Sequence, residues 1–97
     1  MRLQSREKKI IKQAVNKVFG PEAVVYLFGS RIDDQKQGGD IDLYIETNQK
    51  EGVFQKKVQL LGLLFQQMGE QKIDIIINNF NEKLFIYQIA REEGIEL

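Results

Sequence analysis

The pattern of hydrophobic and polar positions divides the chain into alternating helical and extended segments. In three segments the apolar residues recur every three or four positions, which is typical of amphipathic helices. Three shorter runs are almost continuously apolar or alternate strictly, which is typical of strands. The expected elements are helices over residues 5–19, 53–68 and 81–92, strands over residues 23–28, 40–46 and 72–77, and a polar loop over residues 29–39.

Each expected helix carries a stripe of side chains that we predict to be buried. Ser5 is placed to cap the first helix. Glycines follow the helices, as is common at helix ends: Gly20 (before Pro21), Gly69 and Gly94. The predicted stripes are Ile10, Ile11, Ala14, Val15 and Val18 in the first helix, Phe54, Val58, Leu61, Leu64, Phe65 and Met68 in the second, and Leu84, Phe85, Gln88 and Ile89 in the third.

Alternation along two of the strands places carboxylates on one face of each. The residues that share these faces are Asp40, Asp42, Tyr44 and Glu46 on the earlier strand, and Asp74 and Ile76 on the later one. A helix connects these two strands, so they form a βαβ unit with parallel strands, whose starts meet at one edge of the sheet. Asp40, Asp42 and Asp74 are therefore expected to converge.

The strand over residues 23–28 ends in Gly29-Ser30. If this strand runs antiparallel to the other two, its end reaches the edge where the carboxylates gather. Glycine allows a phosphate to approach the backbone, and the Ser30 hydroxyl lies beside N–H groups that can bind an anion. Arg31 could neutralise a phosphate or face solvent. Tyr44 could stack on a base or cover the sheet, and the second role is favoured.

Length and composition limit the fold and the chemistry. The 97 residues allow a single domain, residues 1–97, of the α/β (α+β) class: a small mixed sheet flanked by helices. Without His or Cys, a Cys–His or Ser–His catalytic pair and the usual zinc sites are excluded. Three converging carboxylates instead favour a hard cation such as Mg²⁺, which relieves their mutual repulsion.

Charge and hydropathy bear on partners and location. The net charge is zero, which argues against stable nucleic-acid binding as the main task. No apolar run approaches the roughly 20 residues of a membrane span, and the first residues lack a signal-peptide core, so no membrane association and a cytoplasmic location are expected. Basic residues crowd the first segment and acidic residues the end, which we interpret as solvated faces rather than a binding patch.

The segments Phe28-Gly29-Ser30-Arg31 and Asp40-Ile41-Asp42-Leu43 together resemble the signature of the DNA polymerase beta-like nucleotidyltransferase superfamily. The short length resembles its minimal nucleotidyltransferase branch, whose members are often paired with a HEPN-domain partner in toxin–antitoxin modules. The resemblance implies two Mg²⁺ ions on Asp40 and Asp42, with Asp74 completing the site and helping to activate the attacking hydroxyl. It also implies that Gly29 and Ser30 hold the triphosphate of ATP, the substrate.

The resemblance implies a reaction as well: transfer of AMP from ATP to a hydroxyl, that of a tyrosine in the HEPN toxin, so that the chain acts as an antitoxin. The alternative is a non-catalytic antitoxin that blocks its partner by forming a complex. An antibiotic- or RNA-modifying nucleotidyltransferase is disfavoured because such enzymes usually add a second domain to hold the acceptor, and this chain ends at Leu97. A homodimer that buries a sheet edge is a further expectation.

Overall fold

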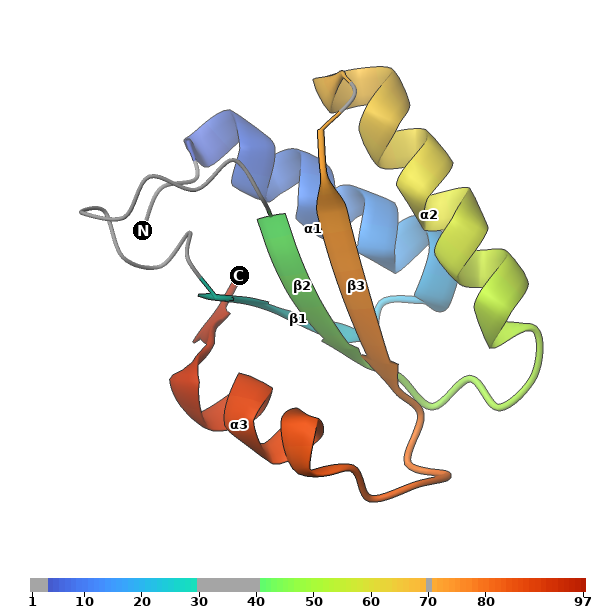
Figure 1. Cartoon of the computed structure of the whole chain (residues 1–97). Helices are drawn as coiled ribbons and strands as arrows, with labels where there is room; N and C mark the ends of the chain where they lie inside the picture. Colours follow the sequence, from blue (N-terminus) through green and yellow to red (C-terminus); the bar gives the residue numbers. More distant parts are fainter. Residues whose placement is uncertain (1–3, 30–40, 70) are drawn as a thin grey trace.

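The computed structural model describes residues 4–29, 41–69 and 71–97, and in these ranges the chain forms three helices and four strands (Figure 1). The order along the chain agrees with the predicted one, apart from a short strand at the end. The elements are α1 (Ser5–Phe19), β1 (Val24–Phe28), β2 (Ile41–Glu46), α2 (Val53–Met68), β3 (Ile73–Asn78), α3 (Phe85–Glu93) and β4 (Ile95–Glu96).

The four strands form one mixed sheet in the order β3-β2-β1-β4. β1 and β2 are antiparallel, with Phe28 opposite Asp42, and β2 and β3 are parallel, with Asp42 opposite Asp74. The predicted βαβ unit is therefore confirmed, and so is the mixed α+β fold. β4 was not predicted: two residues are too few to give a periodic signal, and the strand forms because β1 offers Tyr26 and Leu27 as partners.

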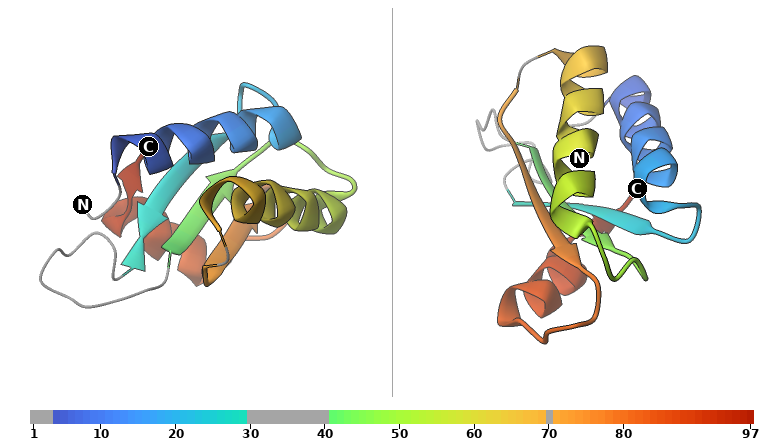
Figure 2. Two further views of the ribbon diagram at one scale, coloured as in Figure 1. Left: turned by 90° about the horizontal axis from the view of Figure 1, so that it is seen from above. Right: turned by 90° about the vertical axis from the view of Figure 1, so that its right-hand side faces the viewer.

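The helices cover the two faces of the sheet unequally. Figure 2 shows α1 and α2 together on one face and α3 alone on the other. The core lies under α1 and α2, and its most buried members are Ile11, Val15, Leu27, Ile41, Leu43, Ile45, Leu60 and Leu64. Since strand side chains alternate between faces, the residues between these strand positions point toward α3. That face carries the polar side chains.

The buried face of α2 differs from the predicted one. The helix buries Leu60 and Leu64, whereas Phe54 and Val58 are 73% and 53% exposed. Phe65 is also exposed, and only Leu61, Leu64 and Met68 of the predicted stripe contact the core. The prediction was wrong for Phe54, Val58 and Phe65, because α2 is apolar around much of its circumference and the spacing fits two stripes. The position of α1 decides which of them is buried.

The ends of α1 and α3 also differ from the prediction. α1 begins at Ser5, preceded by Gln4, whose backbone N–H donates to the Glu7 carboxylate at 3.1 Å, so Ser5 is not the cap. α3 begins at Phe85 rather than at residue 81, and Leu84 and Phe85 are exposed instead of buried. The segment before α3 turns at Phe80, which has a φ of 66° and donates its N–H to the Asn78 side chain. None of the helices in the described ranges is long and apolar enough to cross a membrane.

Candidate active site

Asp42 and Asp74 lie side by side at the start of two parallel strands. They are direct partners in the register of β2 and β3. Neighbouring strands are about 4.8 Å apart, and both residues fall on the sheet face that is not covered by α1 and α2. Asp42 is half-buried and Asp74 is exposed. Two carboxylates are thus presented together, one held within the sheet and one open to solvent.

Gly29 brings the end of β1 against the same carboxylate. It follows Phe28, the register partner of Asp42, and has a φ of 82°. A Cβ atom placed on Gly29 would collide with Oδ2 of Asp42 and lie 3.0 Å from its Cγ. Gly29, at the end of β1, and the start of β2 therefore meet at one edge, and only glycine fits at this position.

The remaining predicted site residues fall outside the described ranges. These are Ser30, Arg31 and Asp40. Their roles in holding the triphosphate and the metal stay predictions. Within residues 4–29, 41–69 and 71–97, no group of three or more acidic residues is close enough to hold a metal ion. The described part of the site is thus the pair Asp42 and Asp74 with Gly29 beside it.

The donor chemistry of this pair fits the Mg²⁺ that the sequence led us to expect. Carboxylate oxygens are the ligands that Mg²⁺ prefers, and it is commonly held by one or two of them together with substrate phosphates. Two carboxylates at neighbouring register positions repel one another, and a cation between them removes that cost. At Gly29 the backbone that follows β1 comes close to the Asp42 carboxylate.

Farther along the same face, a buried polar network ties the sheet to α3. The Tyr44 hydroxyl donates to Oε2 of Glu46 at 2.8 Å and accepts from Nδ2 of Asn78 at 3.0 Å. Arg91 of α3 lies 3.5 Å from the same Glu46 oxygen. Asn78 and Arg91 were not predicted from the sequence, although Glu46 and Tyr44 were placed correctly on one face. The sequence indicates only that Tyr44 and Glu46 share a face. The contact with Asn78 depends on the register of β2 and β3, which the pattern along each strand does not contain.

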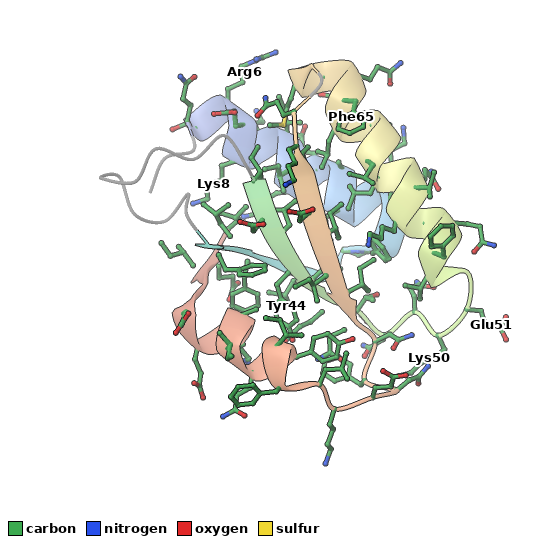
Figure 3. The ribbon with its side chains drawn as sticks, viewed as in Figure 1. Arg6, Lys8, Tyr44, Lys50, Glu51 and Phe65 are labelled. Atoms are coloured by element: carbon green, nitrogen blue, oxygen red, sulfur yellow. The ribbon has the colours of Figure 1, made fainter. Side chains whose placement is uncertain are left out.

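Tyr44 belongs to this network rather than to a base-binding surface. It is 1% exposed, and its ring packs between Tyr26 and Tyr87, with centroids 5.6 and 5.9 Å away. Burial raises the pKa of Tyr44 to about 12, and the Glu46 carboxylate contributes in the same direction. Figure 3 shows Tyr44 on the side of the sheet where α3 lies. The favoured covering role is confirmed.

One depression of the described surface lies away from the carboxylates. It has a volume of about 560 Å³ and is formed by the end of β3, the following turn and the start of α3, including Asn78, Phe80, Phe85 and Tyr87. Asp42 and Asp74 lie at the opposite ends of their strands, four register positions from Asn78. The depression therefore does not belong to the carboxylate site.

The family model described as "Polymerase beta, Nucleotidyltransferase" matches residues 8–96. The match begins within α1, ends in β4 and includes Gly29, Asp42 and Asp74. A comparison with curated proteins finds no matching sequence.

Proposed function

The chain belongs to the polymerase beta nucleotidyltransferase family, and from that membership we propose that it transfers AMP from ATP to a tyrosine hydroxyl of a HEPN-domain partner and so acts as an antitoxin. Nucleotidyl transfer follows from the family. The observation that best supports a working site is the placement of Asp42 and Asp74 as register partners, with Gly29 against Asp42. The nucleotide, the acceptor and the antitoxin role are the proposed part.

In this mechanism Asp42 and Asp74, together with Asp40, hold Mg²⁺. The ion would supply charge neutralisation for the triphosphate and stabilise the attacking and leaving oxygens. Gly29 allows the nucleotide to approach the backbone beside Asp42, and Ser30 and Arg31 contact the triphosphate. Asp74 orients the acceptor hydroxyl and takes its proton. The hydroxyl oxygen bonds to the α-phosphorus, the bond to the β-phosphate oxygen breaks, and pyrophosphate leaves.

The exposure of Asp74 supports an acceptor that comes from another molecule. A base that removes a proton must lie within hydrogen-bonding reach of that proton. Asp74 is exposed at the edge strand β3, whereas Asp42 is half-buried between β1 and β3. A hydroxyl presented by a partner protein could therefore reach Asp74 while the nucleotide lies over Asp42. The two carboxylates thus have different roles: Asp74 contacts the acceptor hydroxyl, and Asp42 lies beneath the nucleotide.

Incubation of the chain with Mg²⁺, α-labelled ATP and the product of the adjacent gene tests the proposal. Asp42→Asn and Asp74→Asn should each lower labelling of the partner by about 100-fold or more, because each removes a charge needed in the transition state. Glu51→Gln is the matched control, since it also neutralises an exposed carboxylate but lies at the far end of the molecule (Figure 3). Full labelling by either Asp variant would contradict the assignment of the site. An unlabelled partner silenced in a tight complex would favour the non-catalytic antitoxin.

Metal binding can be tested without the partner. A ligand that binds only the folded state stabilises it, by about 2.7 kcal/mol at a free concentration of about 100 Kd. We therefore expect Mg²⁺ to raise the melting temperature of the wild-type chain, and to do so less in Asp42→Asn and Asp74→Asn. Glu51→Gln should respond like the wild type. An equal rise in all four proteins would show that Mg²⁺ binds elsewhere.

A further inference from the structure

An apolar stripe along α2 stays largely outside the core. We call it the α2 stripe; it consists of Phe54, Val58, Leu61, Phe65 and Met68, at intervals of four, three, four and three residues. Phe54 and Val58 are the most exposed, Phe65 is 38% exposed, and Leu61 and Met68 are partly buried at the edge of the core. Figure 3 marks Phe65 in the upper part of α2, in the same region as the start of β3. A continuous row of this kind is unusual on a surface that faces only water.

The spacing is that of a helix–helix seam. Alternating steps of three and four residues average 3.5, which keeps one row of side chains in contact with a facing helix. We propose that the α2 stripe packs against the α2 stripe of a second copy of this chain, with the two helices antiparallel about a two-fold axis. The inference does not depend on the reaction that the chain performs.

The order of side-chain sizes favours the antiparallel arrangement. With the axis at Leu61, each Phe54 faces Met68 of the other copy, and each Val58 faces Phe65, so that the two phenylalanines of one helix do not oppose those of the other. A parallel pair would set ring against ring at Phe54 and again at Phe65. Gly62, next to the axis, has nothing within 4 Å of the place where its Cβ would be. It leaves room for Leu61 of the second copy to approach.

The charges of α2 favour its own copy as the occupant. The only charged residues of the helix are Lys56 and Lys57, near its N-terminus, and its first turn contains no acidic residue. Cations at this end are unfavourable for the helix dipole, which is positive there. An antiparallel copy brings its negative C-terminal end to these lysines. From residue 58 to 68 the helix is uncharged, so no like charges oppose one another across the seam.

The exposed area indicates a weak dimer. Because a fully exposed Phe offers ~150–250 Å², the exposed parts of the stripe amount to roughly 300 Å² per copy. A standard stable interface buries about 800 Å² per partner. Association is therefore expected to depend on concentration over the range in which the protein is usually measured, rather than to be permanent.

Sedimentation velocity from about 1 µM to about 500 µM tests the proposal. The wild-type chain should pass from monomer to dimer, and Phe54→Glu should raise the dimer Kd by more than about tenfold because it places a charge in the seam. Phe85→Glu is the matched control: Phe85 is 74% exposed against 73% for Phe54, but lies on α3. Circular dichroism verifies that both variants fold.

Three results would overturn the proposal. One is a wild-type chain that stays monomeric throughout, and another is a dimer that survives Phe54→Glu or is lost in Phe85→Glu. The third is a monomeric chain whose partner protein no longer binds when Phe54 is changed, because the stripe would then serve that partner.

The orientation of the helices can be measured separately, because the chain has no cysteine of its own. A disulfide requires Cα atoms within about 7 Å. On mixing Phe54→Cys with Met68→Cys under oxidising conditions, the antiparallel pair predicts that the mixed disulfide dominates. Dominant disulfides between two Phe54→Cys chains would indicate a parallel pair and contradict the proposal.

Discussion

At Gly29 the backbone of β1 comes so close to Asp42 that no side chain fits between them. The sequence indicated that Gly29 ends a strand and that Asp42 lies on the polar face of the next one. Alternation and the βαβ rule were enough to bring Asp42 and Asp74 together, because both are local patterns. The contact of Gly29 with Asp42 could not be predicted in the same way. It depends on the register between β1 and β2, which many side chains set jointly.

Replacing Gly29 by alanine separates backbone strain from collision. Gly69 is the matched control, since its φ of 81° nearly equals the 82° of Gly29, but nothing lies within 4 Å of its Cβ position. Positive φ alone costs a non-glycine residue about 1–2 kcal/mol, so Gly69→Ala should lose about that much stability in urea. Gly29→Ala should lose more and should also respond less to Mg²⁺, because the added Cβ displaces the Asp42 carboxylate. Equal losses, with the response to Mg²⁺ intact, would contradict the close contact.

At the scale of elements, α2 shows where prediction from one sequence fails. Its existence and both of its ends were predicted correctly, since the apolar spacing begins and stops clearly and Gly69 follows. Its orientation was predicted only in part, because apolar side chains cover more than one face of the helix. Burial of Leu60 in place of Phe54 and Val58 is decided by packing against α1 and the sheet, which the spacing along α2 alone does not contain. The start of α3 shows the same limit of prediction from spacing. The apolar residues at the start of the helix could not be distinguished from residues of the preceding turn.

Two substitutions in α2 distinguish the observed face from the predicted one. Leu60 is fully buried although it is not part of the predicted stripe, so Leu60→Ala should lower the free energy of unfolding by about 2–5 kcal/mol through lost burial and the cavity left behind. Phe54→Ala, measured at a low concentration where the chain is monomeric, should cost less than about 1 kcal/mol despite the larger truncation. Urea unfolding gives both values. A larger loss for Phe54→Ala would mean that the helix is rotated relative to this structure.

A hydroxyl on α3 links that helix to the edge strand. Tyr87 donates to the Ile77 carbonyl oxygen at 3.1 Å. Burial raises the pKa of Tyr87, and the negative charge of Glu82 adds to this. Since the neutral form is favoured in the folded state, its contribution to stability is complete below about pH 10, the ordinary pKa of tyrosine, and is lost as the pH rises through the raised value.

Tyr87→Phe should therefore have opposite consequences at two pH values. At pH 7 it should cost about 1 kcal/mol through the lost hydrogen bond. Above about pH 10 the variant should lose less stability than the wild type, because one ionisation that favours unfolding has been removed. Urea unfolding over this pH range measures both. Tyr44, with its pKa of about 12, should leave some alkaline destabilisation in either protein. If the free energy of unfolding depended on pH in the same way in the wild type and in Tyr87→Phe, Tyr87 would not be buried as described.

Over the whole molecule, the two faces of the sheet are held by different forces. The face under α1 and α2 is apolar and includes nearly all fully buried side chains. On the other face α3 buries only Ala90 completely and is attached through Tyr87 and the ion pair of Arg91 with Glu46. The pattern of apolar positions predicted the first face well, because burial of apolar area is what that pattern records. It could not predict the second, which is held by the packing of Tyr44 between Tyr26 and Tyr87 and by a few polar contacts between distant residues.

This asymmetry predicts two levels of stability in hydrogen exchange. Amides of β1, β2 and α1 should exchange only through global unfolding, since their apolar side chains form one core. Amides of α3 should exchange through a local opening of lower free energy, because few apolar contacts are broken. The free energy of this opening should depend little on denaturant, because little new surface is exposed. Asn78→Ala removes the donor to Tyr44 and the acceptor of the Phe80 N–H, so it should speed exchange in α3 more than in α1. A different result would contradict two levels of stability: amides of α3 that exchange as slowly as those of β2, and whose rates change together with those of β2. It would mean that the polar contacts couple both faces into one cooperative unit.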